Sequence, residues 1–430
     1  MNEEVKQKVD YCLNCKNPQC QVGCPLSNHI PEFIQKVKEE DYEGAYEILS
    51  KTTVLPSVCG RICPHFKQCQ GKCIRGIKGE SVSIGEIEAF VGDWALQNHD
   101  SLQNCYAKMK KQEKLENTKK HVAIIGGGPA GLTCGAFLRK RGFQVTIYEK
   151  YDTLGGILQR GIPEFRLPKD VLDKTIEQII HLGIDVKTNQ ELGKNLQLSD
   201  LQQYDAIFLS IGANIPKKMM IEGEELAGVF GGNTLLEKEQ HPDYTNKKVA
   251  VIGGGNVAMD CARTIKRLGA QEVTVIYRRA EEQMPAERKE IEDAKKEGVQ
   301  FLFQTNVTKI LGTEQVERIE CIKMNLVEKE GEKRNAPIEI PNSNYVIPMD
   351  YVIMAIGSKV NKELLQDLGF EVTEKQYLKV TEENKTSYPK VFAGGDIVGQ
   401  IATVAWASRD GKKAAEEIEA FLREKENLKK

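Results

Sequence analysis

The sequence lacks three features that would assign it to a membrane, to secretion or to a nucleic acid. No apolar run among its 430 residues approaches the roughly 18 to 20 residues that a membrane span needs. The opening residues Met1–Lys6 lack the apolar core of a signal peptide. Sixty basic side chains oppose sixty-two acidic ones, so no excess charge favours a nucleic acid or a membrane surface. We therefore expect a soluble cytoplasmic protein without a nucleic-acid or membrane partner.

Low-complexity segments and solenoid repeats are also absent from the sequence. A length of 430 residues exceeds what one hydrophobic core usually organises, and 40% hydrophobic residues suffice for two or three cores. The composition therefore predicts a globular protein of several domains.

Two glycine-rich motifs give the first positive indication of function. They are Gly126-Gly127-Gly128-Pro129-Ala130-Gly131 and Gly253-Gly254-Gly255-Asn256-Val257-Ala258. Each follows a β-branched apolar run and precedes a helical stretch and a second strand, residues 144–148 and 272–277. In such a βα turn the glycines permit a sharp bend and let backbone N–H groups approach a pyrophosphate. The pattern predicts two Rossmann-like βαβ units, each binding a dinucleotide.

The residues that follow each second strand distinguish the two sites. Glu149 lies at the distance from the first glycines where a carboxylate accepts hydrogen bonds from ribose hydroxyls. Arg278 and Arg279 lie where guanidinium groups can bind a 2′-phosphate. The first site is therefore predicted to take an unphosphorylated ribose, and the second to prefer NADPH to NADH. Two plainer interpretations stay open: an ordinary strand-end carboxylate and a solvated basic pair.

Cysteine is concentrated at the start of the chain. This density in a reducing compartment indicates metal ligation rather than a disulfide scaffold. Zinc is an alternative, although the spacing differs from that of common zinc modules. The first group, followed by Pro25, resembles the bacterial ferredoxin run lengthened by two residues, in which the fourth cysteine ligates the other cluster. Eight of the twelve cysteines lie in two groups, Cys12, Cys15, Cys20 and Cys24, then Cys59, Cys63, Cys69 and Cys73.

These motifs carry a family resemblance over nearly the whole chain. Residues 12–25, 58–64 and 161–169 resemble the small subunit of NADPH-dependent glutamate synthase. The module is also similar to the large subunit of bifurcating ferredoxin:NADP oxidoreductases and to the electron-input half of dihydropyrimidine dehydrogenase. The resemblance implies an α/β protein in which a helical N-terminal domain holds two 4Fe–4S clusters. Two Rossmann-like domains of the disulfide-reductase type would follow and bind FAD and NADPH.

The resemblance also implies the cluster ligands. Glu88 is among them because residues 84–88, Ile-Gly-Glu-Ile-Glu, match the family pattern; an exposed helix carboxylate is the alternative. A carboxylate is a harder donor than a thiolate, so its cluster should have a shifted potential. The remaining cysteines, Cys59, Cys105, Cys134, Cys261 and Cys321, are expected only to pack. One cluster is expected on Cys12, Cys15, Cys20 and Cys73, and the second on Cys24, Cys63, Cys69 and Glu88.

The expected domain boundaries follow the motifs. Residues 1–106 form the helical domain, and residues 107–120 form a solvated helix or linker. The FAD domain comprises residues 121–213 and 351–430, because a strand over residues 351–356 is expected to begin the return to that domain. The NADPH domain, residues 214–350, is inserted between these two parts.

The C-terminal part is expected to complete the flavin site. After the strand at residues 391–393, the resemblance implies that Gly395 and Asp396 meet the ribityl chain and pyrophosphate of FAD. Thr403 and Val404 open a helix whose N-terminus would stabilise the reduced flavin. Gly156 lies where the family wraps the flavin. The alternatives are a plain turn for residues 394–396 and a plain loop around Gly156.

Together these parts predict an NAD(P)H oxidoreductase in which FAD receives the hydride and no side chain acts as acid or base. No CxxC pair follows the first glycine motif or lies in the NADPH domain, which argues against a thioredoxin reductase. The motifs occupy the chain from Cys12 to Phe421, so the electron acceptor is expected on another polypeptide.

We interpret the chain as the electron-input subunit of a glutamate synthase, which forms glutamate from glutamine and 2-oxoglutarate. The alternatives are a standalone or bifurcating NAD(P)H:ferredoxin-type oxidoreductase and the electron-input subunit of a dihydropyrimidine dehydrogenase. A non-enzymatic scaffold is disfavoured, because a scaffold would need neither both glycine motifs nor the cluster ligands.

Overall fold

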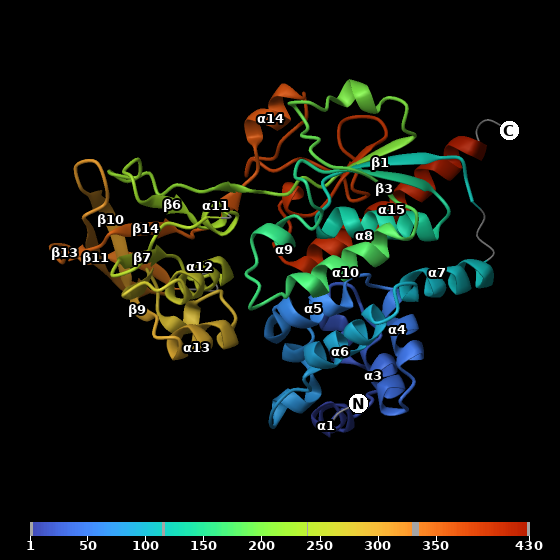
Figure 1. Cartoon of the computed structure of the whole chain (residues 1–430), viewed down its shortest axis with the longest axis horizontal. Helices are drawn as coiled ribbons and strands as arrows, with labels where there is room; N and C mark the ends of the chain where they lie inside the picture. The colour runs from blue at the N-terminus through green and yellow to red at the C-terminus, as the bar shows by residue number, and fades with distance from the viewer. Residues whose placement is uncertain (1–2, 114–116, 239, 329–334, 428–430) are drawn as a thin grey trace. The chain divides into compact units, whose positions relative to one another are not determined.

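A computed structural model describes residues 3–113, 117–238, 240–328 and 335–427. The chain divides into two compact units (Figure 1). The first unit comprises residues 1–159, 164–213 and 360–430, and the second comprises residues 160–163 and 214–359. Most of the second unit is therefore one continuous stretch between two parts of the first.

The first unit begins with helices. Apolar residues recur at helical spacing, as in the helix at residues 30–38, where Ile30, Phe33, Ile34 and Val37 are all buried. Proline stands in the first turn of this helix and of the helix at residues 56–62, where a missing N–H breaks no intrahelical bond. The elements are α1 (Glu3–Asp10), α2 (Gln19–Gly23), α3 (Ile30–Lys38), α4 (Tyr42–Ser50), α5 (Pro56–Ile62), three 3₁₀ turns η1 (His65–Lys67), η2 (Gln70–Lys72) and η3 (Ile74–Ile77), α6 (Ile84–Leu96) and α7 (Ser101–Gln112).

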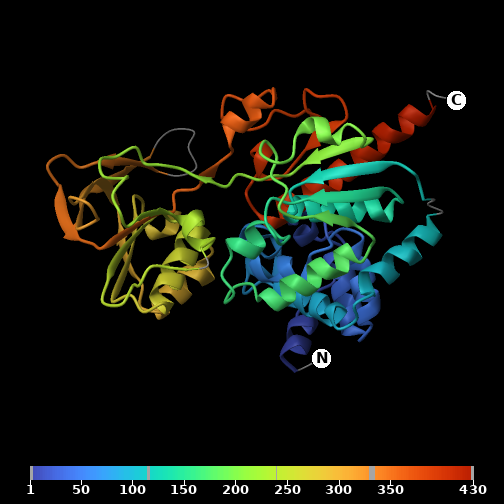
Figure 2. The same ribbon diagram turned by 45° about the horizontal axis from the view of Figure 1, so that its top comes forward.

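The rest of the first unit is built on a five-stranded parallel sheet of order β16-β4-β1-β2-β3. The central strands are buried on both faces, as parallel strands covered on both sides require. Helices α8 and α15 lie along one face in both views (Figures 1 and 2), and the segment around α14 packs on the other. The elements are β1 (His121–Ile125), α8 (Pro129–Lys140), β2 (Gln144–Tyr148), α9 (Ile157–Arg160), α10 (Lys169–Ile180), β3 (Asp185–Lys187), η4 (Leu198–Leu201), β4 (Ala206–Leu209), α14 (Lys362–Asp367), β16 (Val391–Ala393), η6 (Asp396–Val398) and α15 (Val404–Asn427).

Helices α8 and α15 approach each other at the level of the backbone. A Cβ atom on Gly411 of α15 would stand 2.2 Å from the carbonyl oxygen of Ala130 in α8. A Cβ atom on Gly131 would stand 2.0 Å from the carbonyl oxygen of Gly126. Glycine at these two positions is therefore what lets α8 start so close to both β1 and α15.

A buried glutamine connects the helical part of the first unit with its sheet-containing part. Gln178 of α10 donates hydrogen bonds to the carbonyl oxygens of Ala95 (2.9 Å) and Asn98 (2.8 Å), where α6 ends. Its own amide oxygen accepts a hydrogen bond from the Tyr46 hydroxyl at 3.3 Å. Gln178 thereby satisfies carbonyl groups that a helix C-terminus leaves without intrahelical partners.

The second unit contains a five-stranded parallel sheet of order β6-β14-β7-β8-β9. Helices α12 and α13 pack on one face of this sheet, and an antiparallel sheet of β10, β11, β12 and β13 packs on the other. The elements are β5 (Ile215–Pro216), β6 (Val229–Gly231), α11 (Gly232–Leu236), β7 (Lys248–Ile252), α12 (Asn256–Arg267), β8 (Glu272–Tyr277), η5 (Glu281–Gln283), α13 (Arg288–Lys296), β9 (Gln300–Phe303), β10 (Thr305–Leu311), β11 (Arg318–Val327), β12 (Ala336–Glu339), β13 (Tyr345–Pro348), β14 (Tyr351–Met354) and β15 (Ser358–Lys359).

One expected boundary is wrong. The strand expected to begin the return to the first unit, β14, instead pairs with β6 and β7 in the second unit. The chain re-enters the first unit at Val360 rather than at residue 351. An apolar strand followed by glycine is compatible with either parallel sheet, and only its non-local partners decide which one it joins. The segment expected as a solvated helix or linker begins within α7, whose Met109 is buried.

Within the described part of the chain, no helix combines the length and the apolar character that crossing a membrane demands.

Candidate functional sites

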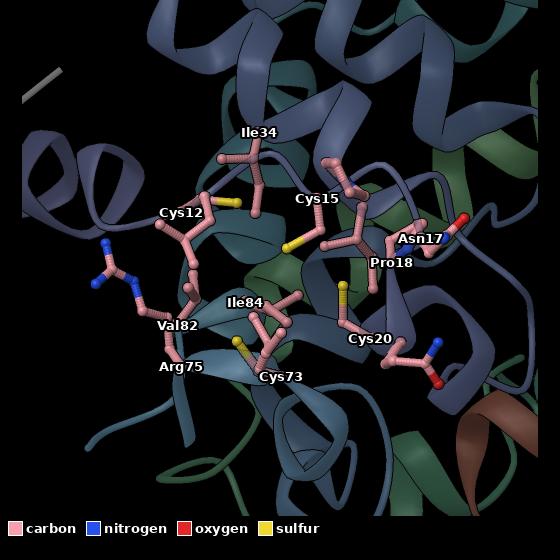
Figure 3. A pocket seen from close by; sticks show the side chains of 15 residues that line it. Cys12, Cys15, Asn17, Pro18, Cys20, Ile34, Cys73, Arg75, Val82 and Ile84 are labelled. Atoms are coloured by element: carbon pink, nitrogen blue, oxygen red, sulfur yellow. The ribbon is translucent and has the colours of Figure 1, made fainter. Parts of the chain in front are cut away.

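Four cysteines of the helical part converge on one pocket. Figure 3 shows the sulfur atoms of Cys12, Cys15, Cys20 and Cys73 turned toward the same space. They come from the loop after α1, the start of α2 and the turn between η2 and η3. The rest of the lining is largely apolar and includes Ile30, Pro31, Ile34, Val82 and Ile84. Four soft thiolate donors in an apolar pocket are the donor set that a 4Fe–4S cluster takes.

The geometry of this pocket separates the alternatives. All twelve cysteines are free, so the disulfide scaffold is wrong. Among the described residues, no three Cys, His, Asp or Glu side chains stand close enough to hold one metal ion. A zinc site needs such closeness, because Zn–S bonds of about 2.3 Å leave sulfur atoms less than about 4 Å apart. In a 4Fe–4S cluster each of the four thiolates binds a different iron atom, so the four cysteines of this pocket match the ligand number of such a cluster.

The second predicted ligand set is also brought together, and it is more deeply buried. Cys63, Cys69 and Glu88 are buried, and Cys24 is half-buried. Burial and then the neighbouring Glu88 carboxylate raise the pKa of Cys24 to about 12. Burial and then Glu88 likewise raise the pKa of Cys69, whereas the pKa of Cys63 is raised first by a hydrogen bond with Cys59. Bound iron would supply the positive charge that such thiols need in order to lose their protons.

Glu88 is held by a buried hydrogen-bond chain. Its side chain is only 5% exposed, so the alternative of an exposed helix carboxylate is wrong. Burial raises its pKa to about 8, and a hydrogen bond from Asn28 opposes that shift. Asn28 Nδ2 donates to Glu88 Oε1 at 3.1 Å, and the Thr52 hydroxyl donates to Asn28 Oδ1 at 2.7 Å. Sequence reasoning did not find Asn28 or Thr52, because they lie 60 and 36 residues before Glu88.

The cysteines predicted only to pack are all buried. Cys59 lies beside the second ligand set, and its carbonyl oxygen is 3.1 Å from His65 Nε2. Cys105, Cys134, Cys261 and Cys321 lie in separate elements of the fold.

The first glycine turn joins β1 to α8. Gly126 has φ +104°, a conformation that favours glycine. A Cβ atom on Gly128 would meet nothing within 4 Å, so this side of the turn is open for a pyrophosphate. Pro129 and Ala130 form the first turn of α8, and Pro129 occupies a position where no N–H is needed.

Glu149 closes over this turn at the end of β2. One carboxylate oxygen accepts a hydrogen bond from Gly127 N at 2.7 Å, and the other accepts one from Tyr151 N at 3.1 Å. The Ser210 hydroxyl at the end of β4 donates to the Gly126 carbonyl oxygen at 2.9 Å. Ser210 was not predicted, because its contact with the turn spans 84 residues. Gly156 also approaches the turn, because a Cβ atom added at this position would stand 3.1 Å from the Gly128 Cα.

The turn after β16 brings two carboxylates to the same edge of the sheet. Gly395 has φ +81°, and its N–H donates to Asp410 of α15 at 2.9 Å. Burial and then the neighbouring Asp410 raise the pKa of Asp396 to about 6. Asp410 is a functional-site candidate that sequence reasoning missed. Its partner, Gly395, lies 15 residues earlier, and no motif marks Asp410.

Helix α15 begins beside the second ligand set. It starts at Val404, one of the two residues predicted to open it. Gln68, which precedes Cys69, donates from its side chain to the Thr403 hydroxyl at 3.5 Å. The cysteine loop and the start of α15 therefore meet within one unit.

The second glycine turn repeats this construction in the second unit. Gly253 has φ +142°, and a Cβ atom added at this position would stand 2.3 Å from the Ala355 carbonyl oxygen. A Cβ atom on Gly255 would meet nothing nearer than 4.0 Å, so this turn is also open. Asn256, Val257 and Ala258 form the first turn of α12.

The segment before α13 packs over this turn, which sequence reasoning missed. Asn256 Oδ1 accepts a hydrogen bond from Glu287 N at 2.9 Å, and Ala286 N donates to the Gly254 carbonyl oxygen at 3.0 Å. The nearest indication of this contact in the sequence is the Met284-Pro285-Ala286 run, which follows the two arginines.

The two predicted arginines differ in their surroundings. Arg278 is exposed at the end of β8. Arg279 is half-buried, and its Nε donates to the Asn335 carbonyl oxygen at 3.0 Å. Arg278 is therefore the better candidate to bind a 2′-phosphate.

Comparison with known proteins identifies the family. Residues 120–411 match the model of the pyridine nucleotide-disulphide oxidoreductases. The glutamate synthase [NADPH] small chain of Escherichia coli is 34% identical over 97% of this chain and 92% of its own length. The chain belongs to the glutamate synthase small-chain family of pyridine nucleotide-disulphide oxidoreductases. Residues 1–100 match a further model, described as dihydropyrimidine dehydrogenase domain II, 4Fe-4S cluster.

These matches confirm the predicted fold class and the predicted cofactors, FAD, NADPH and 4Fe–4S. The family also includes relatives with other names. The NADP(+)-dependent formate dehydrogenase subunit beta of Moorella thermoacetica is 35% identical over 94% of this chain and 60% of its own length.

Solved structures support the fold alone. FprA from Mycobacterium tuberculosis superposes with a TM-score of 0.63 at 20% identity, covering 72% of this chain and 86% of that one. Thioredoxin reductase from T. acidophilum gives a TM-score of 0.53 at 21% identity, covering 71% and 99%. The second unit of this chain holds only two cysteines, Cys261 and Cys321, which are fully buried and lie in different elements. They therefore do not form the neighbouring cysteine pair of a dithiol reductase site.

Proposed function

We propose that this chain is the NADPH-oxidising, electron-input subunit of a glutamate synthase, with two 4Fe–4S clusters that deliver electrons to a partner subunit. The observation that carries this proposal is the junction of Gln68 with Thr403. It brings the loop of Cys69 to the start of α15 within one unit. One compact body thereby holds both cysteine sets and the flavin-type glycine turn.

Each residue set has a defined part in this proposal. The first glycine turn, Gly126, Gly128 and Gly131, would admit the FAD pyrophosphate, and Glu149 would accept hydrogen bonds from its ribose. Each Glu149 oxygen has a second lone pair beyond its bond to the backbone, so ribose can share it. Gly395, Asp396, Thr403 and Val404 would line the flavin.

The second unit would bind the reductant. Gly253, Gly255, Asn256, Val257 and Ala258 would form the pyrophosphate turn of NADPH. Arg278 would bind the 2′-phosphate, with Arg279 beside it. When bound, the nicotinamide and flavin supply hydride transfer and the clusters supply single-electron transfer, so the chain itself needs no acid or base.

The clusters would be held as the resemblance implies. Cys12, Cys15, Cys20 and Cys73 would hold one, and Cys24, Cys63, Cys69 and Glu88 the other. We propose a cytoplasmic location, because thiols at this density stay reduced and available to iron there.

The first test uses the anaerobically reconstituted protein. NADPH should bleach the flavin absorbance much faster than NADH at equal concentration, followed by loss of cluster absorbance. Reduction of the flavin without reduction of any cluster would contradict the electron-input role.

The second test identifies the acceptor by anaerobic affinity isolation from the native host. A large subunit with a glutaminase domain is the expected partner. A ferredoxin or a small flavoprotein in its place would favour the NAD(P)H:ferredoxin-type alternative. That alternative has support from the relatives, which include the NADPH-Fe(3+) oxidoreductase subunit beta of Geobacter sulfurreducens, 34% identical over 94% of this chain and 64% of its own length.

A further inference from the structure

The turn that follows β16 has a backbone conformation that only glycine adopts freely. Gly395 has φ +81° and ψ −154°. This region of backbone space is essentially limited to glycine, and it recurs at ligand-binding turns, where the surrounding structure fixes it. Because a glycine by itself moves among many conformations, a contact is needed to hold Gly395 in this one. The next residue is Asp396, the carboxylate predicted to contact FAD.

Asp410 of α15 makes the contact that holds this turn. Gly395 N donates a hydrogen bond to Asp410 Oδ2 at 2.9 Å, across 15 residues of chain. Asp410 is only 5% exposed, so the bond is shielded from water. A hydrogen bond from a buried N–H to a carboxylate is strong, and an N–H left without its acceptor is costly. Burial raises the pKa of Asp410, and the bond from Gly395 N opposes that rise.

The neighbours of Asp410 fix it in place. Gly411, the next residue of α15, packs on the backbone of α8, because a Cβ atom added there would stand 2.2 Å from the Ala130 carbonyl oxygen. A Cβ atom added at Gly394 would stand 2.9 Å from the Asp410 Cβ. Asp410 therefore lies on a well-anchored part of a helix and directly against the turn that it binds. Side chains on such rigid elements hold a site more precisely than side chains on loops.

The turn lies beside the first glycine motif. Strands β16 and β1 both pair in parallel with β4, so their carboxyl ends lie at the same edge of the sheet. A Cβ atom added at Gly395 would stand 3.2 Å from the Ala130 Cβ in the first turn of α8. Asp396 is half-buried, whereas Asp410 is buried. Of the two carboxylates, Asp396 is therefore the one with access to a ligand at this edge.

We propose that Asp410 is a positioning residue of the flavin site. By accepting the Gly395 N–H, it fixes the turn in the conformation that directs the Asp396 carboxylate toward the ribityl chain of FAD. This inference rests on the proposed function, in which Asp396 contacts FAD. The alternative is a purely structural contact between β16 and α15, which would stabilise the fold whether or not Asp396 is present.

The test measures how fast the full-length, cluster-loaded holoenzyme releases FAD after dilution, from the fluorescence of free FAD. Asp410→Ala removes the acceptor and should speed the release at least about tenfold, as expected for loss of a hydrogen bond to a charged group. Asp410→Asn keeps an oxygen acceptor in a side chain of the same shape, so its release rate should stay within about threefold of wild type. Glu416→Ala removes an exposed carboxylate from the same helix and should behave as wild type.

A double-mutant cycle separates positioning from a structural contact. Asp396→Ala alone should also speed FAD release. If Asp410 acts through Asp396, adding Asp410→Ala to Asp396→Ala should change the release rate by less than about twofold, because residues that act as one unit are not additive. The full tenfold effect of Asp410→Ala in both backgrounds would show a structural contact and overturn the positioning role.

Two further results would overturn the positioning role alone. They are wild-type FAD release from Asp410→Ala, and release from Asp410→Asn that is as fast as from Asp410→Ala. If Asp396→Ala releases FAD at the wild-type rate, the proposed flavin contact itself fails, and the positioning role fails with it. Iron content and the unfolding midpoint check that each variant is folded. If Asp410→Ala does not fold, Asp410→Val takes its place, because valine fills the space without supplying an acceptor.

Discussion

Asn28 donates a hydrogen bond to Glu88 over 3.1 Å, and the two side chains are 1% and 5% exposed. A buried carboxylate oriented by a buried amide is the arrangement by which proteins fix a metal ligand. The Thr52 hydroxyl in turn orients Asn28 by donating to its amide oxygen. If Glu88 ligates iron, Asn28 is its positioning residue.

Replacing Asn28 with Ala should therefore weaken one cluster and spare the other. Replacing a side chain that orients a metal ligand costs about 10- to 100-fold in metal affinity. The expected result is faster loss of about half the iron to a chelator and an altered electron resonance signal from one cluster. Asn104→Ala, on the exposed face of α7, is the control. An unchanged signal in both Asn28→Ala and Glu88→Ala would refute the ligand role of Glu88.

Arg278 should determine the choice between NADPH and NADH. In Arg278→Glu a carboxylate would face the 2′-phosphate, so KM for NADPH should rise at least about tenfold, as expected for loss of a charge-assisted hydrogen bond. KM for NADH should stay within about twofold. Lys375→Glu makes the same charge change at an exposed site in the other unit and should alter neither value. Equal loss of both activities in Arg278→Glu would mean that Arg278 does not distinguish the two nucleotides.

Asp396 should give the flavin-free protein a pH-dependent stability. Burial and then Asp410 raise the pKa of Asp396 to about 6, against about 3.9 in an unfolded chain. The folded state therefore keeps a proton that the unfolded state releases between about pH 4 and 6. The free energy of unfolding should fall by up to about 3 kcal/mol as pH rises through this window.

Urea unfolding of Asp396→Asn at pH 4.5 and pH 7 checks this prediction. The variant should lose less stability than wild type between the two values. Asp367→Asn, which changes an exposed aspartate, should retain the wild-type pH dependence. If wild type and Asp396→Asn lost the same free energy of unfolding between the two pH values, Asp396 would not be the source of the pH dependence.

Gln178 should stabilise the junction between the helical part and the sheet of the first unit. Gln178→Ala removes both hydrogen bonds at the end of α6 and should cost about 2 kcal/mol or more in the free energy of unfolding. The expected readout is a lower unfolding midpoint together with faster amide exchange at residues 95–101. Gln203→Ala, at an exposed position in the same unit, should change neither. A wild-type exchange pattern in Gln178→Ala would show that the junction does not depend on this side chain.

The sequence predicted the parts of the fold that local pattern controls. The bounds of β2 and β8 matched, because each is a buried β-branched run between a helix and a charged residue. Both glycine turns were predicted, since their backbone conformations favour glycine at Gly126 and Gly253. The position of β14 was not predicted, because pairing with β6 and β7 is a long-range property.

The candidate sites show the same division. The cysteines could be found from spacing and resemblance, and the structure brings each predicted set together. Asn28, Ser210 and Asp410 could not be found, because each acts through hydrogen bonds to a distant or unmarked part of the chain. Polar residues of this kind have no periodicity, so only the folded chain identifies them.

One chain is expected to link an NADPH-reducible flavin to two clusters. The most direct test is a single anaerobic preparation analysed for flavin, iron and sulfide, and then titrated with NADPH while electron resonance is recorded. We expect one FAD, about eight iron and about eight sulfide per chain, with cluster signals that appear only after NADPH is added. Zinc in place of iron, or clusters that NADPH leaves oxidised while the flavin is reduced, would contradict it.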